Sequence, residues 1–179
     1  EDSAQANDKP AVVEVSVVET AAVATAMELA RELEALLSSV REDRETLQGS
    51  IGSLHDEYLS REGTQWGELR EVIRELFEAG NQEMEAVNLI LAELDRQTEN
   101  FRKFPAEHRD GMLMESMREL ARAAERRSGE TGAISTALDA VAKMLRDARE
   151  NGEAMPSTET VRETFAGAYQ AQMNAFLAK

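Results

Sequence analysis

Two histidines, His55 and His108, are the residues best suited to metal binding or proton transfer in this chain. A di-iron helical bundle places a glutamate three residues before each ligating histidine, so that both side chains project from one helix face. Here those positions hold Gly52 and Pro105, which argues against a di-iron oxidase. We expect both histidines to lie in solvated helical turns. For His108, whose neighbours are ionisable, a metal site completed by distant carboxylates is the alternative.

Other patterns that usually mark an active site are missing. Cysteine is absent, which excludes disulfides, thiolate nucleophiles, cysteine zinc sites and iron–sulfur clusters. The glycine-containing stretch 49–53 lacks the lysine and the preceding strand of a phosphate-binding loop, and no serine stands in a nucleophile-elbow pattern. Carboxylates are so abundant that no pair stands out as general acid and base. We therefore expect no enzymatic activity, no cofactor and no metal.

Arginines recur every four residues between positions 118 and 126, which predicts a basic stripe along one helix face. The stripe and the glutamates that interleave with it are Arg118, Arg122, Arg126, Arg127, Glu115, Glu119 and Glu125. Pairs of opposite charge at these spacings stabilise a helix by about 0.2–0.5 kcal/mol each, so one interpretation is pairing within the helix. The other is a docking face for an acidic surface, either on this chain or on a second copy.

Three methionines, Met112, Met114 and Met117, stand just before this stripe. Methionine is flexible, so it fills gaps in cores and also recurs at adaptable binding surfaces. Both interpretations are open, and we carry these methionines with the arginines as candidate interaction residues.

Charge is distributed unevenly along the chain. The net charge is −15, and residues 1–101 account for all of it, with 23 acidic and 8 basic side chains. Such a surface repels nucleic acid and anionic lipid, so we expect protein partners. No apolar run approaches the ~18 residues that a membrane-spanning helix needs.

The elements that would position these residues follow from the apolar spacing. Steps of three and four, the heptad pattern of helices that pack lengthwise, run over residues 23–58 and again over 66–101. Between the runs, Gly63 suits a helix end and Thr64 a helix start. This predicts an antiparallel hairpin with arms of ~55 Å, with one continuous rod as the alternative. Arg44 falls on the apolar seam, where a buried arginine needs a carboxylate partner or an exit to solvent.

Three shorter helices are predicted after the hairpin, over residues 105–127, 133–150 and 157–179. Pro105 suits the first turn of a helix, the stretch 126–132 reads as a loop, and Asn151 with Gly152 ends the middle helix. The last helix has an apolar face made of Val161, Phe165, Tyr169, Met173 and Phe176. A capping box is expected from Thr160 to Glu163.

The N-terminal residues lack the heptad spacing of the hairpin. Residues 1–10 are small and polar, whereas residues 11–18 alternate valine with polar side chains, a strand pattern without a partner strand. A helix extension, a disordered tail and a strand that pairs with another protein are the open alternatives.

The predicted fold is therefore all-α. A flexible tail (1–19) precedes a long antiparallel coiled-coil-like helical hairpin (20–104) and a three-helix region (105–179), which together form a helical bundle. Aromatic residues make up only 4% of the chain, and large rings usually supply much of the buried area of a core. We therefore expect another copy to cover part of the apolar seam. The favoured function is a non-enzymatic structural or assembly protein that self-associates through helix–helix contacts. The alternative is a periplasmic or secreted accessory or sensor bundle that braces a membrane complex or binds a small ligand; an opening Glu1 in place of Met permits it.

Overall fold

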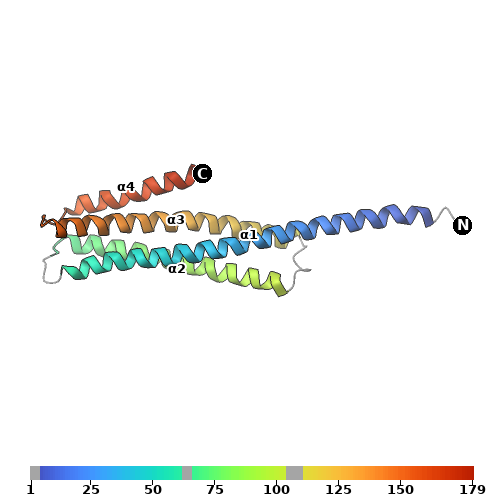
Figure 1. Ribbon diagram of the computed structural model, residues 1–179, viewed down its shortest axis with the longest axis horizontal. Helices are drawn as coiled ribbons and strands as arrows, with labels where there is room; N and C mark the ends of the chain where they lie inside the picture. The colour runs from blue at the N-terminus through green and yellow to red at the C-terminus, as the bar shows by residue number, and fades with distance from the viewer. Residues whose placement is uncertain (1–4, 62–65, 104–110) are drawn as a thin grey trace.

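The computed structural model describes residues 5–61, 66–103 and 111–179, and the side chains of all of these except 5–24, 111 and 112. Four helices make up the described residues: α1 (Gln5–Ser60), α2 (Leu69–Lys103), α3 (Gly111–Glu150) and α4 (Thr158–Leu177). Successive helices run in opposite directions along one long axis (Figure 1). The predicted all-α helical bundle is confirmed.

α1 and α2 form the antiparallel hairpin that the heptad spacing predicts. The two helices contact each other and lie side by side in Figure 1, and α3 packs against both. The connection falls where it is predicted, between the two heptad runs and thus between Arg61 and Trp66, although Gly63 and Thr64 themselves lie outside the described residues. The continuous rod is therefore wrong.

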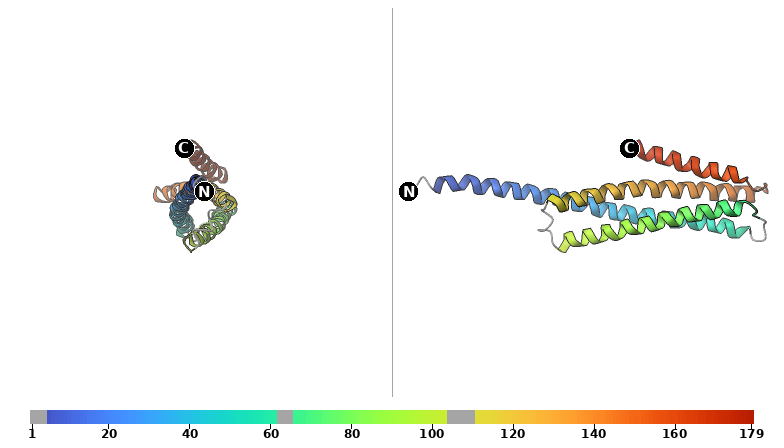
Figure 2. Two further views of the ribbon diagram at one scale, coloured as in Figure 1. Left: turned by 90° about the vertical axis from the view of Figure 1, so that its right-hand side faces the viewer. Right: turned by 180° about the vertical axis from the view of Figure 1, so that it is seen from behind.

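α1 begins earlier than the spacing predicts. Residues 5–24, called here the leading segment, are helical. This agrees with the helix-extension alternative for residues 11–18 and excludes the strand alternative there, whereas the flexible tail over residues 1–19 stays a prediction. Figures 1 and 2 show the leading segment extending past the other helices of the described chain. The first buried side chain described on α1 is Ala26, at the edge of the bundle.

α3 is one helix where the sequence predicts two. The predicted loop at residues 126–132 lies inside it, and the predicted start at Pro105 lies outside the described residues. Glycine in a helix interior costs about 1 kcal/mol relative to alanine, but here Gly129 leaves room for a ring. A Cβ built on Gly129 would stand 2.6 Å from the Phe176 ring of α4. Tertiary packing therefore overrides the local preference for a loop.

Two apolar cores lie along the bundle, one toward each end. The three-helix core is built by α1, α2 and α3; its most enclosed members are Leu33, Val40, Val87, Leu94 and Ala124. The four-helix core also receives Val161 from α4; its other fully enclosed members are Leu47, Leu54, Val72, Ile73, Leu138, Val141 and Leu145. Polar side chains occupy the turns between the two cores.

α4 packs mainly on α3 and contacts α2 at its first turns. Gly152 has a positive φ of 66° and ends α3 as predicted. The helix is capped by Ser157, whose hydroxyl accepts a hydrogen bond from the Thr160 amide, so the predicted capping box at Thr160 is wrong. The predicted apolar face is correct, since its five residues are all buried or half-buried. None of the helices, as far as they are described, is long and apolar enough to cross a membrane.

Candidate interaction site

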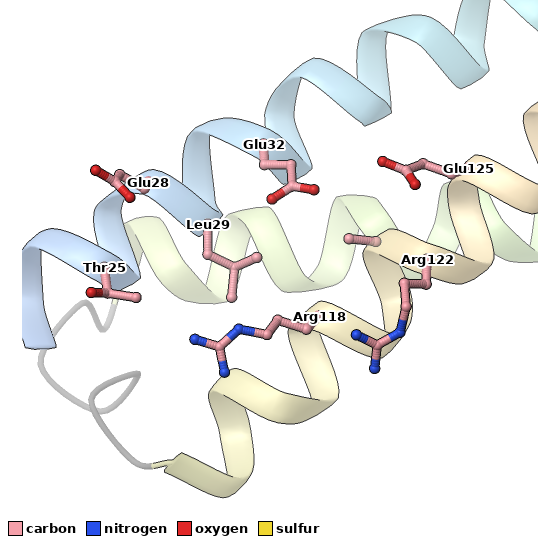
Figure 3. Close-up of a pocket in the computed structure, with 8 residues that line it drawn as sticks. Thr25, Glu28, Leu29, Glu32, Arg118, Arg122 and Glu125 are labelled. Atoms are coloured by element: carbon pink, nitrogen blue, oxygen red, sulfur yellow. The ribbon is translucent and has the colours of Figure 1, made fainter. Parts of the chain in front are cut away.

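The arginine stripe faces an acidic stretch of α1 across a charged cleft. The cleft has a volume of about 340 Å³ and lies beside the three-helix core, next to the leading segment. Figure 3 shows its two walls, which consist of Thr25, Glu28, Leu29 and Glu32 on α1 and of Arg118, Ala121, Arg122 and Glu125 on α3. The structure thus brings Arg118 and Arg122 together opposite carboxylates of the same chain.

Both arginines also have a partner on their own helix. A guanidinium nitrogen of Arg118 lies 3.7 Å from a Glu115 carboxylate oxygen, and one of Arg122 lies 3.2 Å from the other oxygen. All three side chains are exposed, and exposed ion pairs contribute only about 0–1 kcal/mol. Pairing within the helix is therefore present, and the acidic wall of α1 stands opposite the same two arginines.

The remaining arginines of the predicted set lie elsewhere. Arg126 lines a separate groove of about 480 Å³ between α2 and α3, beside Leu89, which is 74% exposed. Arg44 is exposed on α1 and does not enter the seam. Its neighbour Asp43 turns inward and accepts a hydrogen bond from Ser128. The predicted residues therefore do not form one surface.

The methionines divide in the same way. Met114 and Met117 are only 6% and 2% exposed and belong to the three-helix core. They fill the core, as one of the two interpretations has it, and present no free surface. The side chain of Met112 lies outside the described residues.

A layer of polar contacts separates the two cores. It lies at residues 126–132 of α3, where the sequence predicts a loop. The Arg127 guanidinium donates to both carboxylate oxygens of Glu83 on α2, at 3.1 and 2.9 Å. The Thr131 hydroxyl donates to the same carboxylate at 2.8 Å. The Ser128 hydroxyl donates to Asp43 of α1 at 2.6 Å. This polar layer therefore joins α3 to both helices of the hairpin, and Glu83, although buried, is fully paired.

Burial and hydrogen bonding shift two pKa values in and beside this layer. Desolvation raises the pKa of Asp43, and the hydrogen bond from Ser128 opposes this only in part. On α4, the Tyr169 hydroxyl donates to Glu130 at 2.6 Å. That hydrogen bond, together with burial, raises the pKa of Tyr169 to about 12. A carboxylate acceptor stabilises the protonated phenol and would repel its anion.

A second, half-buried ion pair joins α1 to α3 beside the four-helix core. Arg149 donates to both oxygens of Glu57, at 2.9 and 3.2 Å, and these hydrogen bonds lower the pKa of Glu57. One turn further along the chain, just past the end of α1, Arg61 donates to the Leu145 carbonyl at 2.8 Å. Glu57 is therefore not part of a solvated turn, although its neighbour His55 is exposed as predicted.

The inward polar residues have a signal in the sequence. On α2 the buried positions Leu76, Gly80, Glu83 and Val87 keep an unbroken three-and-four spacing. If only apolar residues are counted, Met84 takes the place of Glu83 and the spacing appears to break. On α1 the inward set is Val40, Asp43, Leu47, Ser50, Leu54 and Glu57. Polar residues in the seam thus explain why the apolar spacing alone breaks near Gly80 and why Asp43, rather than Arg44, turns toward the other helices.

The arrangement offers helix surfaces, a charged cleft and paired polar layers. Within the described residues no group of three or more histidine, aspartate or glutamate side chains is placed to hold a metal ion; His108 lies outside them. Comparison with protein-family models, with curated proteins and with solved structures finds no match to this chain. The function must be inferred from the chain's own geometry.

Proposed function

We propose that this chain is a non-enzymatic assembly protein that self-associates through helix–helix contacts, with the leading segment of α1 as the main contact. The observation that carries the proposal is the extension of α1 beyond the bundle, where no other helix of the described chain accompanies it. The segment is about 30 Å long at 1.5 Å per residue.

An unaccompanied helix of this composition needs a partner to be stable. In proteins most helical stability comes from packing of an apolar face against other elements, and valine lowers helix propensity because it loses side-chain freedom in a helix. Residues 11–24 contain six valines and four alanines but only two charged residues, Glu14 and Glu19. Burial of these apolar residues against another helix would supply the missing stabilisation.

The charges oppose association of two copies, so the contact proposed between them is an apolar one. The arginines of the charged cleft already face Glu28 and Glu32 and pair with Glu115, so they offer little attraction to an outside acidic surface. Each copy carries a net charge of −15. Association through the leading segment should therefore strengthen as salt screens the repulsion between copies.

Sedimentation equilibrium over a range of protein concentrations tests the proposal. The full chain should associate reversibly, and Val15→Glu should raise the dissociation constant by about tenfold or more, which corresponds to ~1.4 kcal/mol. Ser16→Glu is the matched control, since it adds the same charge to the next residue and removes no apolar side chain. A full chain that stays monomeric at every concentration, or two variants with equal effects, would contradict the proposal.

A further inference from the structure

A pocket of a different kind opens between α1 and α2, beside the four-helix core. Its volume is about 360 Å³, within the ~300–1,000 Å³ usual for small-molecule sites. The lining residues are His55, Tyr58, Leu59, Arg70, Ile73, Arg74 and Phe77. None of them belongs to the interaction residues that the sequence predicts.

The walls of this pocket are aromatic and aliphatic. The Phe77 ring meets His55 edge to face at 6.0 Å between centroids and Tyr58 at 6.5 Å. Tyr58 in turn stacks on Trp66 at 4.8 Å with a 22° angle between the ring planes. These are the stacked and edge-to-face arrangements that aromatic pairs prefer. In a chain with only 4% aromatic residues, this is a concentrated patch of ring surface.

The rim of the pocket is basic. Arg74 is held by its helical neighbours Glu71 and Glu78. Arg70, one turn earlier on α2, is exposed, and no carboxylate of the described chain lies within ion-pair distance of it. A guanidinium free to donate several hydrogen bonds thus stands next to an apolar, ring-lined wall. In the charged cleft, by contrast, three glutamates already face the two arginines.

We propose that this pocket binds a small molecule with a flat apolar or aromatic body and one anionic group. The body would lie against Tyr58, Phe77 and the exposed Leu59, since ring faces and aliphatic side chains favour flat apolar surfaces. The anion would pair with Arg70, because a guanidinium binds carboxylates and sulfonates through two parallel hydrogen bonds. The site is separate from the leading segment, so this proposal does not depend on the proposed assembly.

The probe for the test is 8-anilino-1-naphthalenesulfonate, a fluorescent aromatic anion. Trp66 is the only tryptophan, and it stacks on Tyr58, which lines the pocket. A probe in the pocket should therefore quench Trp66 by energy transfer and give one saturable site per chain. Non-saturable binding, or probe fluorescence without Trp66 quenching, would overturn the proposal.

Two variants and a neutral probe separate the parts of the proposal. Arg70→Gln should weaken binding by about tenfold or more, as expected for the loss of a charge-assisted hydrogen bond. Arg44→Gln, which changes an exposed arginine of α1 outside the pocket, is the matched control and should leave binding unchanged. N-phenyl-1-naphthylamine, which lacks the sulfonate, should bind more weakly than the anion and should not respond to Arg70→Gln. Equal affinity for both probes, or no effect of Arg70→Gln, would show that the site does not select anions.

Discussion

The three-helix core and the four-helix core are built from the same long helices but differ in what α3 brings to them. To the four-helix core α3 contributes Leu138, Val141 and Leu145, which pack with aromatic rings and with α4. To the three-helix core it contributes mainly methionine and alanine. The charged cleft opens beside the three-helix core, where the alanines of α3 are smaller than the leucines it contributes to the four-helix core. From this comparison we expect the four-helix core to contribute most to stability, while the proposed contact between copies falls at the three-helix end, which continues into the leading segment.

The largest expected effect comes from cavities cut into the two cores. Leu145→Ala should destabilise the protein by about 4 kcal/mol, and Leu33→Ala by about 2–3 kcal/mol. Both side chains are fully buried, but the core around Leu33 includes Met114 and Met117, which can shift to fill a cavity. Urea unfolding of the two variants measures the difference. An equal or larger cost for Leu33→Ala would remove the contrast between the cores.

The polar layer between the cores gives the next effect. Glu83→Ala should cost about 2–3 kcal/mol, because it leaves Arg127 and the Thr131 hydroxyl without their shared acceptor inside the bundle. The triple variant Glu83→Leu, Arg127→Leu, Thr131→Val removes every partner at once and should unfold near the wild-type urea concentration. If the triple variant is as unstable as Glu83→Ala, the layer stabilises the fold through more than mutual satisfaction of its groups.

Acid should weaken the ion pair beside the four-helix core. Because Arg149 lowers the pKa of Glu57, the stabilisation is present above the ordinary glutamate pKa of about 4.5 and is lost as the pH falls through the lowered value. Arg149→Gln should therefore reduce stability at pH 7 and make little difference at pH 2. Arg102→Gln, which breaks exposed pairs beside the three-helix core, should change stability by less than about 0.5 kcal/mol at either pH. Matched urea midpoints for Arg149→Gln and wild type at pH 7 would count against the pair.

The smallest effect concerns α4, which completes only one of the two cores. Because the pKa of Tyr169 is raised to about 12, its hydrogen bond contributes fully to the free energy of unfolding below pH 10. This contribution is lost as the pH rises through 12. Tyr58→Phe leaves Tyr169 as the only tyrosine, so absorbance at 295 nm can follow its titration. Glu130→Gln in that background should move the midpoint down toward 10. A midpoint near 10 in both proteins would mean that Tyr169 does not bond to Glu130.

The sequence predicts the hairpin because heptad spacing follows from helix geometry and needs no knowledge of the partner helix. It does not predict that Asp43 and Glu83 turn inward. A polar side chain is stable in a helix seam only when another residue there forms a hydrogen bond with it, and both of these partners lie on α3. The continuity of α3 fails to be predicted for a related reason. Ser128, Gly129 and Thr131 favour a loop locally, yet each meets a specific side chain of another helix in the fold.

The candidate site is predicted in part. The spacing of Arg118 and Arg122 places them on one helix face, and both line the charged cleft. Their acidic neighbours Glu28 and Glu32 come from a helix more than 80 residues earlier, so only the packing of α1 on α3 reveals the pairing. The aromatic pocket is missed because its rings come from both arms of the hairpin, and no local motif joins them.

Hydrogen exchange along α1, measured at a low and a high protein concentration, tests the central claim most directly. Amides around Leu54, in the four-helix core, should be protected equally at both concentrations, since that core is complete within one chain. Amides of the leading segment should exchange freely at the low concentration and become protected at the high one, as copies associate. A leading segment that is equally protected at both concentrations, or unprotected at both, would contradict the account.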